Sequence, residues 1–221
     1  MQRLMVAALT SGAGKTSVTM GLAALWRQAG KTVQVYKTGP DYIDPQFHTA
    51  ITGRPCINLD TYFLDASELR ETFSRYQGEA DILLVEAAMG LTDGIAGQGD
   101  RASALQVART LSLPILLLVA RGSEEEAAEK LSALTAEDRA RIRGLVLNEG
   151  GKGEAAPGAE VLREIGTVPV LGCIPALGAQ TLKSRHLGLV VPLEAEEILG
   201  FARRMAAALK EALPDDFFFG G

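Results

Sequence analysis

Short apolar runs alternate with stretches of helical spacing along most of the 221-residue chain. The apolar runs, bounded by turn-forming residues, are RLMVAAL (3–9), TVQVYK (32–37), DILLVE (81–86), PILLLV (114–119), GLVLNE (144–149) and TVPVLGCI (167–174). The stretches with helical spacing include SVTMGLAALWRQAG (17–30), RASALQVARTL (101–111) and EEEAAEKLSALTAEDRAR (124–141). Strands and helices that alternate in this way form right-handed crossovers and a parallel sheet covered on both faces. The pattern therefore predicts an α/β fold with a mainly parallel sheet.

The last helical pattern, PLEAEEILGFARRMAAALKEALP (192–214), is amphipathic and should end at Pro214, because proline cannot continue a helix. A short tail with three consecutive phenylalanines follows it. Such a tail can pack on the domain, mediate a contact or be a ragged end, and the sequence leaves these alternatives open. We expect one domain over residues 1–212 and a tail over residues 213–221.

The composition narrows the class of protein. Hydrophobic residues make up 47% of the chain, which supports a substantial core. The most apolar run, PILLLVA (114–120), is about a third of the roughly 20 residues that a membrane-spanning helix needs. The net charge of −5 disfavours nucleic acid as a partner. With no small-residue cleavage site near the N-terminus, we expect a cytoplasmic protein that binds neither membrane nor nucleic acid.

A glycine-rich motif, TSGAGKTS (10–17), lies between the first predicted strand and the first predicted helix. Gly12 and Gly14 allow successive backbone N–H groups to point at phosphate oxygens, and the start of the helix adds positive potential there. Lys15 would reach the β- and γ-phosphates, and the Thr16 hydroxyl would coordinate Mg²⁺. The motif therefore predicts a phosphate-binding loop.

This motif departs from the common phosphate-loop pattern at its start, where Leu9 stands in place of glycine. A glycine turn with a merely exposed lysine is the alternative, but a strand before the motif and a helix after it favour nucleotide binding. Dimeric ATPase switches of the partition and division-site type carry a second lysine early in the loop, where this chain has Thr10. Such a switch is therefore disfavoured.

Ionisable and polar residues stand at the ends of several predicted strands. Lys37 ends the second strand, Glu86 the third, and Asn148 comes near the end of the fifth. The carboxyl ends of parallel strands meet at one edge of the sheet, where ligands bind. These side chains should therefore face the phosphate-binding loop.

The segment YKTGPDYIDPQFHTA (36–50) contains glycine and two prolines and is predicted to be a loop over the same edge. Asp41 and Asp44 are hard oxygen ligands suited to Mg²⁺, and Lys37 offers a cation to phosphate or to a substrate carboxylate. Alternatively, the aspartates could cap backbone N–H groups in a turn. A second segment, EAAMGLTDG (86–94), again carries two acids beside glycine, which favours a functional role.

Several of these segments closely resemble one known family. TSGAGKTS (10–17), YKTGPDYIDPQFHTAITGRPCINLD (36–60), VEAAMGLTDG (85–94) and SRHLGLV (184–190) resemble the synthetase domain of cobyrinic acid a,c-diamide synthase and of its relatives that amidate hydrogenobyrinic acid and nickel-sirohydrochlorin. The resemblance covers nearly all of the chain. It implies a P-loop NTPase fold similar to dethiobiotin synthetase. It also implies phosphorylation of a peripheral acetate of a tetrapyrrole by ATP, followed by attack of ammonia on the acyl phosphate.

The same resemblance implies roles for individual residues. Nucleotide binding is assigned to Gly12, Ala13, Gly14, Lys15, Thr16, Ser17 and Asn148, the last resembling an adenine-reading asparagine. Catalysis is assigned to Lys15, Lys37, Asp44, Glu86 and Asp93, with Thr16, Asp44 and Glu86 as Mg²⁺ ligands. Substrate contacts are assigned to Asp41, Tyr42, Ile43 and His48. His186 is a further family landmark, and either histidine can instead be a packed or surface residue.

Members of this family continue into a glutaminase domain with a cysteine nucleophile, and this chain ends where that domain would start. Neither Cys56 nor Cys173 lies in a nucleophile-elbow context or at metal-ligand spacing, so both are expected to be idle or buried thiols. We therefore expect an ATP-dependent amide ligase that receives ammonia externally or from a separate glutaminase subunit. The alternatives are an ATP-dependent ligase acting on another small carboxylate or amine, and a non-catalytic nucleotide-binding homologue. A homodimer is left open.

Overall fold

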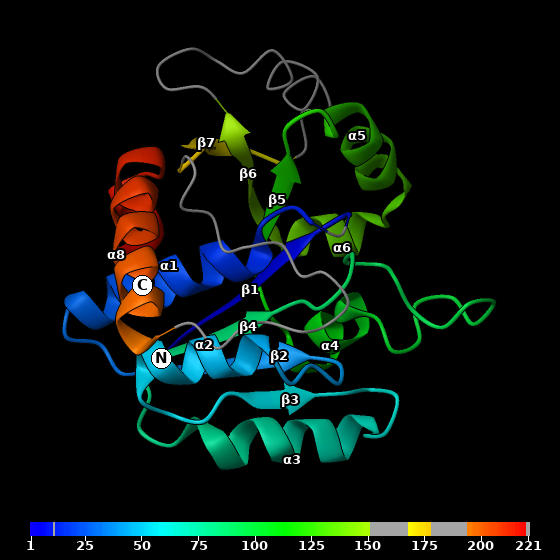
Figure 1. Ribbon diagram of the computed structural model, residues 1–221. Helices are drawn as coiled ribbons and strands as arrows, with labels where there is room; N and C mark the ends of the chain where they lie inside the picture. Colours follow the sequence, from blue (N-terminus) through cyan, green and yellow to red (C-terminus); the bar gives the residue numbers. More distant parts are fainter. Residues whose placement is uncertain (11, 151–167, 178–193, 220–221) are drawn as a thin grey trace.

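The computed structural model describes residues 1–10, 12–150, 168–177 and 194–219. Seven parallel strands form one sheet in the order β3-β2-β4-β1-β5-β6-β7 (Figure 1). The strands are β1 (Gln2–Ala8), β2 (Val33–Thr38), β3 (Ile57–Leu59), β4 (Ile82–Glu86), β5 (Ile115–Ala120), β6 (Ile142–Gly150) and β7 (Val170–Pro175). All six apolar runs are strands, so the predicted α/β fold is confirmed; β3, only three residues long, was not predicted.

Helices cover both faces of this sheet. The helices are α1 (Lys15–Gln28), α2 (Asp44–Thr52), α3 (Ala66–Gln77), α4 (Ala104–Leu111), α5 (Glu124–Ala133), α6 (Ala136–Arg141), α8 (Ala195–Ala212) and α9 (Asp215–Phe219). α1, α2 and α8 pack on one face, whereas α3, α4 and α5 pack on the other. The sheet is therefore the middle of three layers.

Strand β1 shows why the strand sequences consist of continuous apolar residues. Successive side chains of a strand point to opposite faces of the sheet. Met5 and Ala7 join the core under α3, α4 and α5, whereas Val6 and Ala8 join the core under α1, α2 and α8. Both faces are buried, so every position favours an apolar residue.

Three local predictions were wrong or incomplete. The segment 36–50 is not a loop throughout, because helix α2 begins at Asp44 with Pro45 in its first turn, where proline is tolerated. The pattern 124–141 forms two helices, because Thr135 accepts a hydrogen bond from Asp138 N and starts α6. Helix α3 was missed, although Asp65 and Glu68 form a capping box at its start.

Phe217 and Phe218 of the C-terminal tail pack on the domain, which is one of the alternatives that the sequence left open for the tail. Phe218 is buried, and its carbonyl oxygen accepts a hydrogen bond of 3.2 Å from Trp26 Nε1. Trp26 is fully buried. Helix α8 approaches α1 closely at Gly21, where a Cβ atom would lie 2.4 Å from Met205 Cγ. The last two described helices thus complete one face of the core.

Candidate functional site

The phosphate-binding loop connects β1 to α1 at the carboxyl edge of the sheet. Gly14 precedes α1 in the left-handed region, with φ 85°. A Cβ atom on Gly14 would lie 2.2 Å from Asn148 Nδ2, so the loop needs glycine here for conformation and for space. Asn148 Nδ2 donates a hydrogen bond of 2.9 Å to the Ala13 carbonyl oxygen. Strand β6 therefore supports the loop through Asn148.

Four side chains from four elements converge beside this loop. We call Thr16, Lys37, Asp44 and Glu86 the buried charge cluster. Thr16 Oγ1 lies within hydrogen-bond distance of Glu86 Oε1 (2.7 Å) and Asp44 Oδ2 (3.1 Å). Lys37 Nζ donates to the same two oxygens, at 2.6 Å to Glu86 and 2.7 Å to Asp44. The structure thus brings together the predicted Mg²⁺ ligands and one of the predicted catalytic lysines.

The fold explains how residues so far apart in sequence meet. Lys37 and Glu86 are register partners in the adjacent parallel strands β2 and β4. Asp44 is the first residue of α2, and Thr16 lies in the first turn of α1. The starts of both helices therefore point their polar side chains at the ends of two neighbouring strands.

Burial and neighbouring charges shift the pKa values of Glu86 and Lys15. Burial alone would raise the pKa of Glu86, but the charge of Lys37 and the hydrogen bond from His48 outweigh it and lower the pKa to about 2. Burial lowers the pKa of Lys15, and the negative charges of Glu86 and Asp93 oppose that effect. Glu86 is therefore a fully buried, ionised carboxylate.

His48 lies behind the cluster. Its Nε2 is 2.5 Å from Glu86 Oε2, and both side chains are fully buried. Because Glu86 is ionised, Nε2 carries the proton and donates. Sequence reasoning assigned His48 to substrate contact, whereas the structure places it against the carboxylate that holds the cluster together. His186 lies outside the described residues.

The remaining predicted residues lie around the cluster. Asp41 Oδ1 accepts hydrogen bonds from the backbone N–H groups of Ile43 and Asp44. This is the capping role that the sequence left open as an alternative. Asp41 Oδ2 lies 3.6 Å from Lys37 Nζ. Tyr42 is exposed. Asp93 accepts a hydrogen bond of 2.9 Å from Gly90 N and so also stabilises a turn. Both aspartates thus combine a structural contact with a charge near the loop.

One residue near the loop was missed by the sequence reasoning. Lys130 on α5 donates a hydrogen bond of 3.2 Å from Nζ to the Leu9 carbonyl oxygen and pairs with Glu126. In sequence, Lys130 belongs to a charged, helically spaced stretch that is typical of a solvated surface. Its contact depends on where α5 follows β5, and no local signal indicates that.

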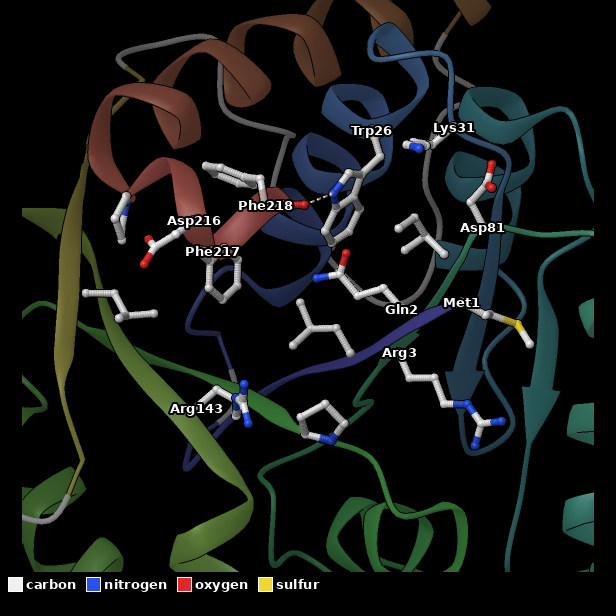
Figure 2. A pocket seen from close by; sticks show the side chains of 15 residues that line it. Met1, Gln2, Arg3, Trp26, Lys31, Asp81, Arg143, Asp216, Phe217 and Phe218 are labelled. Atoms are coloured by element: carbon white, nitrogen blue, oxygen red, sulfur yellow. Dashed lines mark hydrogen bonds between the residues drawn. The ribbon is translucent and has the colours of Figure 1, made fainter. Parts of the chain in front are cut away.

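A pocket of about 850 Å³ lies at the opposite, amino edge of the sheet (Figure 2). Its lining includes the start of β1, residues just before β4 and β5, the end of α1, and α9. Figure 2 shows the Phe217 ring facing this pocket and the Phe218 carbonyl bonded to Trp26. Among the described residues that line it, none was predicted as a site residue. The candidate site is therefore the carboxyl edge.

The loop, the sheet order and the buried charge cluster define a P-loop nucleotide-binding domain. The family described as CobQ/CobB/MinD/ParA nucleotide binding domain matches residues 4–187, and the chain belongs to this family. Within the described residues, no helix is long and apolar enough to cross a membrane.

Two similar proteins carry names that agree with the motifs. Cobyrinate a,c-diamide synthase from Gloeobacter violaceus is 39% identical over 213 residues, covering 94% of this chain and 46% of that protein. Hydrogenobyrinate a,c-diamide synthase from Agrobacterium fabrum is 36% identical over 220 residues, covering 98% of this chain and 50% of that protein. The predicted resemblance is confirmed. The chain spans about half the length of these curated relatives.

Solved structures with little sequence similarity share the fold. The MinD cell division protein from Aquifex aeolicus has a TM-score of 0.57 at 16% identity, covering 94% of this chain and 98% of that one. The signal recognition particle receptor FtsY from Elizabethkingia anophelis, in complex with GDP, has a TM-score of 0.56 at 18% identity. The match covers 92% of this chain and 64% of that one. The predicted P-loop NTPase fold is thereby confirmed.

Proposed function

We propose that this chain is the synthetase part of an ATP-dependent amide ligase that acts on peripheral carboxylates of a cobyrinate-like tetrapyrrole. The observation that carries the proposal is the buried charge cluster, which places a hydroxyl, a cation and two carboxylates beside the phosphate-binding loop. The names of the similar proteins support the substrate class. A protein that only binds nucleotide would not need this complete set.

The chemistry requires activation of a carboxylate. Ammonia does not displace oxide from a carboxylate, so the carboxylate oxygen first attacks the γ-phosphorus of ATP and ADP leaves. Ammonia then attacks the acyl carbon, the bond to phosphate breaks, and inorganic phosphate leaves as the nitrogen loses its proton. Gly12, Gly14 and Lys15 would bind the phosphates of ATP. Lys37, 2.6 Å from Glu86, would neutralise charge that develops on the transferred phosphoryl group.

The residues fit a role in holding Mg²⁺. Thr16 Oγ1, Asp44 Oδ2 and Glu86 Oε1 are hard oxygen ligands, and their contacts of 2.7 and 3.1 Å bring them together. Mg²⁺ commonly keeps several waters and binds substrate phosphates besides one or two carboxylates. When bound, Mg²⁺ would supply positive charge to the β- and γ-phosphates.

The ammonia source is part of the proposal. We expect free ammonium, or a separate glutaminase, to supply it. At fixed total ammonium the rate should rise with pH, because only unprotonated ammonia is a nucleophile. Glutamine alone should not support amide formation by the purified chain.

Mass spectrometry of cobyrinic and hydrogenobyrinic acid incubated with ATP, Mg²⁺ and ammonium tests the function. Each carboxylate converted to an amide should appear with one ADP. Lys15→Ala should bind ATP at least about tenfold more weakly and form no product, because it removes the positive charge that would contact the β- and γ-phosphates. Arg75→Ala, at an exposed ion pair on α3, is the matched control and should behave like the parent. No amide from either acid, with ATP bound normally, would contradict the proposal.

A further inference from the structure

Large apolar side chains are exposed at the carboxyl edge. We call Tyr42, Tyr62, Phe63 and Met89 the aromatic rim; 78%, 58%, 73% and 58% of their respective surfaces are exposed. They lie on the segments that follow β2, β3 and β4, which are neighbours in the sheet. Among the described residues, only Met1 and Tyr76 are other large hydrophobic side chains with comparable exposure. Exposed apolar surface that gathers at one place indicates a binding face.

Hydrogen bonds hold the three segments of the rim side by side. Gly39 N donates 3.0 Å to the Leu59 carbonyl oxygen, and Asn58 Nδ2 donates 2.8 Å to the Asp41 carbonyl oxygen, so the segments after β2 and β3 are joined. Ala88 N donates 2.9 Å to Thr38 Oγ1, which joins the segments after β2 and β4. The rim is therefore carried by the same backbone that carries Lys37 and Glu86.

The sheet order places the rim on one side of the phosphate loop. Asn148, which supports the loop, comes from β6, two strands away from β1 in one direction. Lys37 and Glu86 of the buried charge cluster lie on β2 and β4, and the rim segments follow β2, β3 and β4, in the other direction. Thr16, in the first turn of α1, lies 2.7 Å from Glu86, so the γ-phosphate of a nucleotide bound by the loop would lie beside the cluster. An acceptor carboxylate would then approach from the side of the rim.

We propose that the aromatic rim binds the large apolar macrocycle of the acceptor and so selects a macrocyclic polycarboxylate over a small aliphatic carboxylate. This inference rests on the proposed function. The Tyr62 and Phe63 rings contact each other edge to face, with centroids 4.9 Å apart, and so form a broad apolar surface. A ring system can cover that surface while its peripheral carboxylates extend toward Lys37. A small aliphatic acid would leave the rim in water.

The test is binding of hydrogenobyrinic and cobyrinic acid by equilibrium dialysis, read from the absorbance of the conjugated ring. The Tyr62→Ser and Phe63→Ser double variant should bind both acids about ten- to a hundredfold more weakly. Its KM for the acceptor should rise similarly while kcat at saturation changes little. ATP affinity and Tm should stay at the parent values, because both rings are exposed. Tyr76→Ser, an exposed tyrosine near the end of α3, is the matched control and should bind normally.

The outcomes separate this inference from the proposed function. Parent protein that amidates a tetrapyrrole, with a double variant whose binding and KM are unchanged, overturns the rim inference alone. Parent protein that neither binds nor amidates any tetrapyrrole overturns both. If the double variant has a lowered Tm, the single variants Tyr62→Ser and Phe63→Ser replace it. Each removes one ring and should bind the acids about threefold to tenfold more weakly than the parent, and parent-level binding by both single variants would overturn the rim inference.

Discussion

Two carboxylates in this domain, Glu86 and Asp138, have similarly lowered pKa values but lie in different surroundings. In the buried charge cluster, Glu86 is ionised with a pKa of about 2 although it is fully buried. On the other face of the sheet, Arg109 makes a two-pronged ion pair with Asp138, with both N–O distances 2.8 Å, and its hydrogen bonds lower the pKa of Asp138 to about 2. A lowered pKa alone therefore does not mark a functional site.

What differs is the geometry around the two carboxylates. Arg109 is about 40% exposed and joins α4 to α6. Glu86 is enclosed by a lysine, a threonine hydroxyl and a histidine from three other elements, at the sheet edge that carries the phosphate-binding loop. The first arrangement holds two helices together. The second keeps charged groups desolvated where phosphate charge would arrive.

Removing Lys37 from the buried charge cluster and Arg109 from its ion pair should give the largest difference in the free energy of unfolding and in ATP turnover. Lys37→Met leaves two buried carboxylates without their partner and should lower the free energy of unfolding by about 3–5 kcal/mol, with ATP turnover lost. Arg109→Met removes a partly exposed cation and should cost about 1 kcal/mol, with turnover unchanged. Urea unfolding and ADP release measure the two effects. Equal stability losses would mean that the two groups are energetically alike.

The pH dependence of stability should distinguish Glu86 from an ordinary carboxylate. Its folded pKa is depressed from 4.5 to about 2, so its contribution is present above pH 4.5 and is lost as the pH falls toward 2. The contribution is about 3 kcal/mol. Urea unfolding at pH 6 and pH 3 should show that Glu86→Gln loses less stability over this interval than the parent. An identical loss would show that the Glu86 carboxylate is not responsible.

His48 should act as a positioning residue for Glu86. His48→Leu removes the donor to Glu86 Oε2 and should lower the free energy of unfolding by about 1–3 kcal/mol. It should also raise the half-saturating Mg²⁺ concentration about tenfold. His48→Gln keeps an N–H donor and should recover most of both losses. Titration of Mg²⁺ in an ATP-turnover assay measures the metal effect, and equal behaviour of the two variants would contradict positioning through Glu86.

A substitution at the amino edge of the sheet should have the smallest effect on the free energy of unfolding. Trp26→Phe loses the hydrogen bond to the Phe218 carbonyl and leaves some space, which should cost about 1–2 kcal/mol. ATP affinity and turnover should be unchanged, because Trp26 lines the pocket at the edge opposite the phosphate loop. Thermal unfolding and a turnover assay check the two parts. A large loss of turnover would show that the two edges are coupled.

Strand positions and the phosphate loop were predictable because their physical causes are local. A strand buried on both faces requires consecutive apolar residues, and the bend of the loop requires glycine. Helix α2 was hidden because its first turn contains proline next to a glycine-proline segment, which locally resembles a loop. The short strand β3 was also missed because three residues show no clear alternation.

By itself, the sequence determined the α/β class, the phosphate-binding loop and the resemblance to cobyrinate a,c-diamide synthases, since each depends on residues close together in the chain. Only the tertiary structure decided that Lys37 and Glu86 are register partners, that His48 lies behind Glu86, and that the rim segments lie side by side. These contacts depend on the order of strands in the sheet. That order is set by packing over the whole domain, and no short segment contains it.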